Sequence, residues 1–158
     1  MMLYLAAKFQ HKEICLSLIP LLTNSGHIVI GRWLSGGHEQ DVEDVGLRRL
    51  YAEEDLDDIG LADAVVLLQL PVEQPEPSTG RFIEAGYALG IGKPLIVVGK
   101  ADCVFFHLPE VVRYPTIESF VAAYAGGARV DPPVASPPRA AAGRVGPTRR
   151  GLGGRRAS

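Results

Sequence analysis

Residues 63–70 read Asp-Ala-Val-Val-Leu-Leu-Gln-Leu, a nearly continuous apolar run. A strand that is buried on both faces of a parallel sheet has this composition, whereas a half-exposed strand alternates apolar and polar residues. A second apolar run, Leu95-Ile96-Val97-Val98-Gly99, follows it, and a helical pattern over 80–91 separates the two. This order predicts two parallel strands that are joined by a crossover helix.

The rest of the chain extends the same alternation. We expect further strands at 3–7, 27–34 and 111–114, and further helices at 8–24, 44–60 and 116–124. Pro20 predicts a kink or an early end in the first of these helices. The alternation predicts an α/β fold of the flavodoxin-like (Rossmann-like) type, with a doubly wound parallel sheet of five strands in the order 2-1-3-4-5. Ligands of such sheets lie beyond the carboxyl ends of strands 1 and 3, where the strand order reverses.

One segment near that point has the composition of a binding site. Residues 78–84, Ser-Thr-Gly-Arg-Phe-Ile-Glu, open the helix after the central strand. Free backbone N–H groups at a helix start bind anions, and Glu84 lies about one and a half turns further on. An anion-binding turn followed by a carboxylate predicts a nucleotide site with a nucleophile. Ordinary helix capping by Ser and Thr is the alternative interpretation.

Several short motifs, taken in order, resemble the nucleoside 2-deoxyribosyltransferase-like family, which includes the 2'-deoxynucleoside 5'-phosphate N-hydrolases. They are Tyr4-Leu5-Ala6-Ala7, Asp55-Leu56-Asp57-Asp58-Ile59, Ala62-Asp63-Ala64-Val65, Ser78–Glu84 and Gly92-Lys93-Pro94. The resemblance runs from about residue 2 to residue 124 and implies cleavage of an N-glycosidic bond, by hydrolysis or by deoxyribosyl transfer. It also implies an enzyme without a cofactor that assembles as a homo-oligomer.

The resemblance assigns three catalytic residues. Glu84 matches the nucleophile of the family, Tyr4 matches a tyrosine whose hydroxyl orients it, and Asp55 matches an aspartate near the leaving base or sugar, where it can donate a proton. Each has a structural alternative: a salt-bridged surface glutamate, a core aromatic residue, and an acid on a solvated helix face. We assign Asp63 a structural role at the turn into the central strand.

Four further residues are candidates for substrate binding. Members of the family that act on 5'-monophosphates carry Ser at the position of Ser78, and Gly80 adds backbone N–H groups at the same turn. Lys8 follows the first strand, where the family hydrolases have a Gly/Arg-containing loop that this chain lacks. Trp33 is the single tryptophan, and we expect it to end the second strand, where it either stacks on a base or packs at the rim.

Charge divides the chain into two parts. Residues 127–158 hold seven Arg and one Asp, a net charge of +6, against −2 for the whole chain, so the first 126 residues carry −8. The basic part is rich in Pro, Gly and Ala and has little to bury, which predicts a disordered tail after a single domain at 1–126. The acidic domain argues against nucleic acid as the main ligand, although the arginines of the tail offer a contact to nucleic acid or to an acidic partner.

Other classes of protein are disfavoured by what the sequence lacks. No apolar run reaches the ~20 residues of a membrane span. The four histidines show no metal-ligand spacing, and Cys15 and Cys103 are far apart, which favours reduced thiols and a cytoplasmic location. Two other functions stay open: a non-catalytic nucleotide-binding module whose tail engages a partner, and a cytokinin-type phosphoribohydrolase. The latter family uses a Gly-Gly-x-Gly-Thr loop that is absent here.

Overall fold

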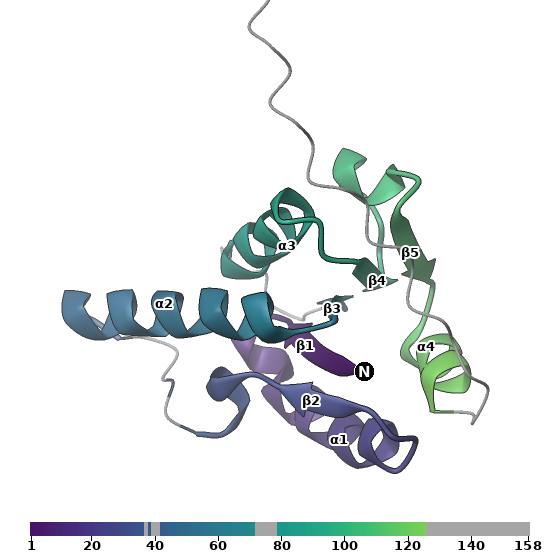
Figure 1. Ribbon diagram of the computed structural model, residues 1–158, viewed down its shortest axis with the longest axis horizontal. Helices are drawn as coiled ribbons and strands as arrows, with labels where there is room; N and C mark the ends of the chain where they lie inside the picture. The colour runs from purple at the N-terminus through teal and green to yellow at the C-terminus, as the bar shows by residue number, and fades with distance from the viewer. Residues whose placement is uncertain (37, 39–41, 72–78, 126–158) are drawn as a thin grey trace, which may run out of the picture.

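The computed structural model describes residues 1–36, 38, 42–71 and 79–125 (Figure 1). It contains one five-stranded parallel sheet in the order β2-β1-β3-β4-β5, which confirms the predicted fold class and strand order. The strands are β1 (Met2–Ala6), β2 (Ile28–Ile30), β3 (Ala64–Gln69), β4 (Leu95–Gly99) and β5 (Val111–Tyr114). Ser78 and the predicted tail lie outside the described residues.

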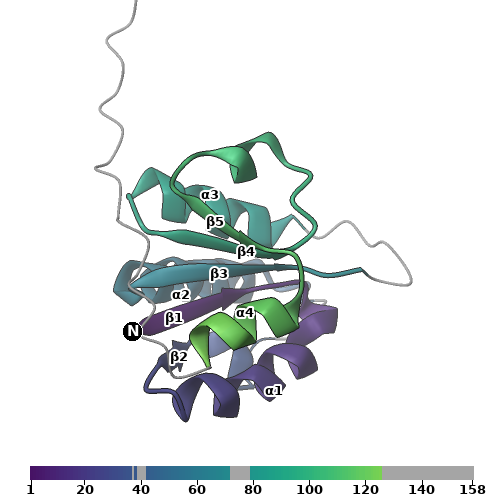
Figure 2. The ribbon, with the colours of Figure 1, turned by 90° about the vertical axis from the view of Figure 1, so that its right-hand side faces the viewer.

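Four α-helices cover the two faces of the sheet. They are α1 (Lys12–Thr23), α2 (Val45–Leu61), α3 (Gly80–Gly90) and α4 (Ile117–Tyr124). Helices α2 and α3 lie side by side on one face, and α1 and α4 lie on the other (Figures 1 and 2). Among the residues that the structure describes, no helix is both long enough and apolar enough to cross a membrane.

The apolar run of β3 forms the centre of the sheet. All six residues of the strand are buried, and the strand pairs with β1 from Leu3↔Ala64 to Ala6↔Leu67 and with β4 from Val65↔Leu95 to Gln69↔Gly99. Helices cover it on both sides, so burial of both faces explains why the sequence shows no alternation here. The carboxyl ends of β1 and β3 consequently lie next to each other at one edge of the sheet.

The segment after β1 begins differently from the prediction. Residues Phe9–His11 form a 3-10 turn, and α1 starts only at Lys12. The expected early end at Pro20 is wrong, because α1 continues to Thr23. Buried Leu18 and Leu22 anchor the last turns against the core, and the carbonyl of Pro20 accepts a hydrogen bond from the backbone N–H of Asn24. Packing here outweighs the cost of a proline inside a helix.

The second strand is much shorter than the predicted 27–34. It ends at Ile30 because Gly31 has a φ of +146°, a conformation that favours glycine, and residues 32–34 then form a 3-10 turn. The prediction that Trp33 ends the strand is therefore wrong. The indole Nε1–H of Trp33 instead donates a 2.9 Å hydrogen bond to the carbonyl of Leu5, which turns the chain across the end of β1.

Candidate active site

The loops that follow β1 and β3 meet at the carboxyl edge of the sheet. His11, in the turn after β1, hydrogen-bonds through Nε2 to the carbonyl of Pro71 at 3.3 Å, and His11 is 5% exposed. This contact joins two segments that are 60 residues apart at the point where the strand order reverses. The structure thus confirms the placement that the topology predicts for these loops.

Glu84 reaches this edge from α3. The helix packs against β1, β3 and α2, and Glu84 is partly buried on it. A Cβ placed on Gly80 would lie 3.8 Å from Glu84 Oε1, so the carboxylate folds back toward the start of its own helix. Burial raises the pKa of Glu84 to about 8; the charge of Asp55 adds to this rise, and Arg81 opposes it.

Tyr4 lies beneath Glu84, in the middle of β1. Its side chain is 0% exposed, although its hydroxyl is polar. Burial raises the pKa of Tyr4, and the nearby carboxylates of Glu84 and Asp55 raise it further. Tyr4 Oη has no hydrogen-bond partner among the described residues, which is unusual for a buried hydroxyl.

Asp55 completes the group from α2. Burial raises its pKa, the positive charge of His38 and the Tyr4 hydroxyl lower it, and Asp58 and Glu54 raise it. Tyr4 Oη and Asp55 are near enough to affect each other's pKa. Within the described part of the chain, however, neither Tyr4 Oη nor Asp55 Oδ1 has a partner that meets the geometry of a hydrogen bond.

Three elements therefore bring one phenol and two carboxyl groups together. The sequence separations are large, and the three side chains meet only because α2 and α3 lie over β1 on the same face. The charge of Asp55 raises the pKa of Glu84, and two carboxyl groups that interact in this way tend to share one proton near neutral pH. Such a pair can supply a nucleophile and an acid at the same time.

Arg81 is a neighbour of this group that we did not single out from the sequence. It is 8% exposed, its Nε donates to Gln69 Oε1 at 3.1 Å, and its charge acts on Glu84. Burial lowers the pKa of Arg81, and the charges of Glu84 and Asp102 partly offset this. The available signal was its place directly after Gly80, inside the predicted anion-binding turn.

The predicted substrate-binding residues have different outcomes. Lys8 is 8% exposed at the end of β1, and its charge lowers the pKa of His11, so it lies at the same edge of the sheet. Gly80 begins α3, after Thr79 in the N-cap position. Trp33 is 7% exposed, and the carbonyl of Leu5 occupies its N–H. Of the two alternatives for Trp33, stacking on a base and packing at the rim, this burial favours packing.

Other residues have structural roles. Asp63 Oδ2 accepts a 2.7 Å hydrogen bond from the backbone N–H of Met2, which confirms the structural role predicted for it. Cys15 and Cys103 are free thiols. In the described ranges, no three His, Cys, Asp or Glu side chains are grouped so that they would hold a metal ion.

Comparisons with known proteins support the fold. No protein-family model matches the chain, and no curated protein sequence matches it. A solved structure of the 2-deoxyribosyltransferase from the psychrotolerant bacterium Bacillus psychrosaccharolyticus aligns with a TM-score of 0.53 at 19% identity, over 72% of this chain and 85% of that chain. The structure of the Clostridium botulinum CMP N-glycosidase BcmB aligns with a TM-score of 0.48 at 21% identity, over 77% of this chain and 96% of that chain. The chain thus shares the flavodoxin-like fold of the Bacillus 2-deoxyribosyltransferase.

Proposed function

We propose that this protein is a nucleoside 2-deoxyribosyltransferase-like enzyme that cleaves the N-glycosidic bond of a (deoxy)nucleoside or of its 5'-monophosphate. One observation carries the proposal: Glu84, Asp55 and Tyr4 converge at the edge of the sheet where ligands of this fold bind. The shared fold with a 2-deoxyribosyltransferase supports it. A module that only binds nucleotides has no need for a buried pair of carboxyl groups with raised pKa values.

The first step is attack by Glu84. Its carboxylate oxygen bonds to C1' of the sugar while the bond from C1' to the base nitrogen breaks, and the electron pair of that bond leaves with the base. Asp55 gives its proton to the base. The product is a glycosyl ester on Glu84 and a free base.

The second step releases the sugar. The oxygen of a water molecule attacks C1', the ester bond breaks, and Glu84 regains its carboxylate while Asp55 takes a proton from the water. A second base in place of water gives deoxyribosyl transfer. Tyr4 orients the Glu84 carboxylate in both steps, since its hydroxyl is buried beside it and has no partner among the described residues.

Basic groups at the same edge favour a phosphorylated substrate. Lys8 and Arg81 approach from the ends of β1 and the start of α3, and both act on His11. Together with the backbone N–H groups around Gly80, they form an environment that attracts a dianionic phosphate. Ser78 lies outside the described residues, and its contact with a phosphate stays a prediction from the sequence. We infer that a 5'-monophosphate has a higher kcat/KM than its nucleoside.

The test is a panel assay. Nucleosides and their 5'-monophosphates are incubated with the protein, with and without a second free base, and released or exchanged bases are measured by chromatography. Glu84→Gln serves as the inactive variant, and Glu13→Gln, an exposed residue on the opposite face of the sheet, serves as the matched control. We expect release by the wild type and by Glu13→Gln only. If no member of the panel loses its base, the proposed function is wrong.

A further inference from the structure

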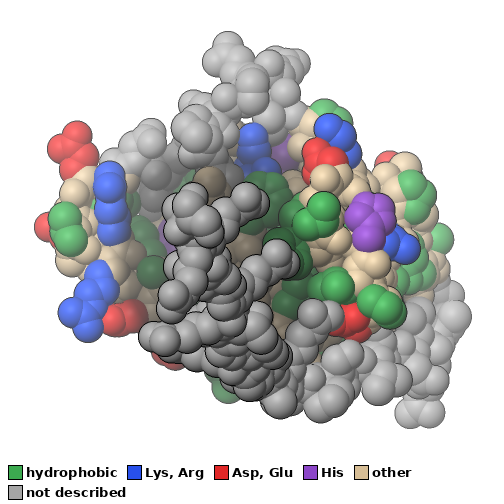
Figure 3. Space-filling view, turned by 90° about the horizontal axis from the view of Figure 1, so that it is seen from above, with side chains coloured by type: hydrophobic (Ala, Val, Ile, Leu, Met, Phe, Trp, Pro, Cys, Tyr) green, Lys and Arg blue, Asp and Glu red, His purple; other side chains and the backbone are tan. Residues whose placement is uncertain are grey.

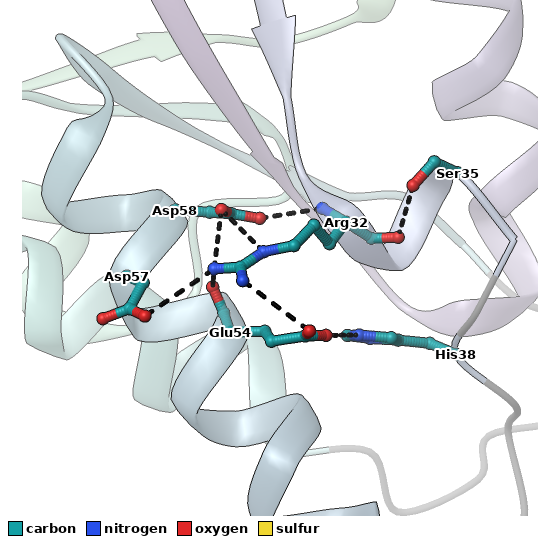
Figure 4. Close-up of polar contacts among 6 residues, drawn as sticks. All are labelled: Arg32, Ser35, His38, Glu54, Asp57 and Asp58. Atoms are coloured by element: carbon teal, nitrogen blue, oxygen red, sulfur yellow. Dashed lines mark hydrogen bonds and ion pairs between the residues drawn. The ribbon is translucent and has the colours of Figure 1, made fainter.

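A network of charged side chains lies on α2 beside Asp55 (Figure 4). Arg32, in the turn after β2, donates from Nε to Asp58 Oδ1 at 3.0 Å, and its backbone N–H donates to Asp58 Oδ2 at 2.8 Å. Its guanidinium also donates to the Glu54 carbonyl at 2.8 Å and pairs with Glu54 Oε1 at 3.6 Å. We call Arg32, His38, Glu54 and Asp58 the α2 clamp.

His38 closes the α2 clamp from the other side. Its Nε2 lies 2.9 Å from Glu54 Oε2, and its ring stacks on Tyr51 with a centroid distance of 3.9 Å and an interplanar angle of 21°. The residue is 9% exposed, so both contacts are sheltered from solvent. His38 is therefore fixed against α2 by two independent contacts.

Helical spacing places Asp55 among the residues that the α2 clamp holds. Tyr51, Glu54, Asp55 and Asp58 follow the 3-4-7 pattern of a single helix face. Asp55 lies four residues after the ring that stacks on His38 and three residues before the carboxylate that holds Arg32. A contact that holds this face also sets the direction in which Asp55 projects toward Tyr4.

Charge gives the α2 clamp a second effect. Residues 53–58 contain five acids, and like charges at these spacings destabilise a helix and hold protons on its carboxyl groups. Arg32 pairs with Glu54, Asp57 and Asp58. The groups that face Asp55 are Tyr4 from β1, Glu84 from α3, His38 from the loop after β2, and Glu54 and Asp58 from α2 itself. His38 is the basic member of that set, and its imidazole is positively charged when both ring nitrogens carry a proton.

We propose that His38 is a positioning residue for Asp55: through its contacts with Glu54 and Tyr51 it fixes the helical turn that carries this carboxyl group. The inference rests on the proposed function, in which Asp55 is the acid. The charge of His38 lowers the pKa of Asp55, so loss of His38 makes the proton harder to donate. Ion pairs contribute little net stability, whether they are exposed or sheltered, so stability alone does not account for this arrangement.

The test compares His38→Gln, Asp55→Asn and the double variant on the best substrate of the panel. We expect His38→Gln to lower kcat by about 10-fold with KM little changed, a part of the ~100-fold or larger effect of general acid catalysis. In the Asp55→Asn background, we expect His38→Gln to have no further effect, because the group on which it acts is gone. His107→Gln, an exposed histidine that hydrogen-bonds to the Ala101 carbonyl, is the matched control.

The pH profile separates positioning from a general loss of structure. Asp55→Asn should remove one limb of the pH profile of kcat/KM, because that limb reports the titration of Asp55. In His38→Gln the same limb should move to higher pH, because the variant lacks the side chain whose charge lowers the pKa of Asp55. If His38→Gln does not fold, His38→Phe replaces it, because a phenyl ring can keep the stack on Tyr51 but carries no charge.

Additive losses in the double variant, or a limb that stays in place in the His38 variant, would overturn the role of His38. That result leaves the proposed function intact as long as the wild type releases base and Asp55→Asn does so more slowly. A wild type that releases no base, in contrast, removes the proposed function itself.

Discussion

Helix α3 separates two surfaces of opposite character. Its side toward β1 and α2 carries Glu84 among the buried polar groups of the candidate site. Its other side, with Phe82, Gly86 and Leu89, lines a groove of about 730 Å³ against residues 102–110. Figure 3 looks onto the molecule from above Figure 1 and shows hydrophobic side chains gathered on the surface with charged ones around them.

The contrast between the two sides of α3 shows that buried polar groups, and not the size of a groove, indicate a reactive site. The groove is roomy and mostly apolar, and Phe105 beside it is 61% exposed, which costs the fold little. The buried groups on the other side cost stability, because two carboxyl groups and a hydroxyl that has no partner among the described residues lose their hydration. A chain that keeps such groups at the ligand-binding edge of its sheet gains something other than stability.

The largest effect on activity is expected for a substitution of Glu84. We expect Glu84→Gln to lower kcat/KM by at least ~100-fold, since the nucleophile and its charge are both lost. Steady-state rates on the best substrate of the panel measure this, and circular dichroism checks that the fold is kept. A variant with nearly wild-type turnover would show that the buried side of α3 is not the reactive one.

Tyr4→Phe sharpens the comparison further. We expect kcat to fall about 10-fold, the scale of one hydrogen bond to a charged group, with little change in KM. The free energy of unfolding should stay the same or rise, because the Tyr4 hydroxyl is buried without a partner among the described residues. Rates and chemical denaturation measure the two effects. A large loss of stability with unchanged kcat would instead make Tyr4 a core residue only.

Stability should depend on pH through Glu84. Its pKa is about 8 in the folded protein against an ordinary value of 4.5, so between these values the folded state binds a proton that the unfolded chain has lost. The free energy of unfolding therefore falls as pH rises through this window. Glu84→Gln has no carboxyl group to titrate at this position, so its free energy of unfolding should not fall in this window. Its thermal midpoint should therefore exceed that of the wild type by a few degrees near pH 8 and by less near pH 5. A difference that is equal at both pH values would contradict the burial of this carboxyl group.

The smallest effect is expected on the groove side of α3. Phe105→Ala removes an exposed ring beside the groove and should change kcat/KM by less than about threefold, as surface substitutions away from a site do. Steady-state rates and light scattering measure activity and assembly together. A large loss of activity accompanied by a change in assembly would mean that a second subunit completes the site across this surface.

Much of this arrangement was accessible from the sequence. The apolar run of β3 and its neighbours predicted the sheet, its order and the edge at which the loops meet, because burial on both faces leaves a direct mark on composition. The resemblance to a known family selected Tyr4, Asp55 and Glu84, and the structure brings them together. Their roles in catalysis stay predictions.

Other features depend on contacts that local patterns do not encode. The short β2 results from Gly31 and from a hydrogen bond between Trp33 and Leu5, which are 28 residues apart. An arginine at the start of a helix is usually exposed, but Arg81 is buried and donates a hydrogen bond to Gln69 at the end of β3. His38 contacts Glu54, which lies on a different element 16 residues away, so no local pattern marks this histidine.

The most direct measurement of the central claim is the mass of the protein during turnover. The reaction is stopped with acid soon after mixing with the best substrate, and the intact protein and its peptides are weighed by mass spectrometry. The account predicts an added mass equal to the glycosyl group of the substrate, carried by the peptide that contains Glu84 and absent from Glu84→Gln. An adduct on another residue, or rapid base release by Glu84→Gln, would contradict it.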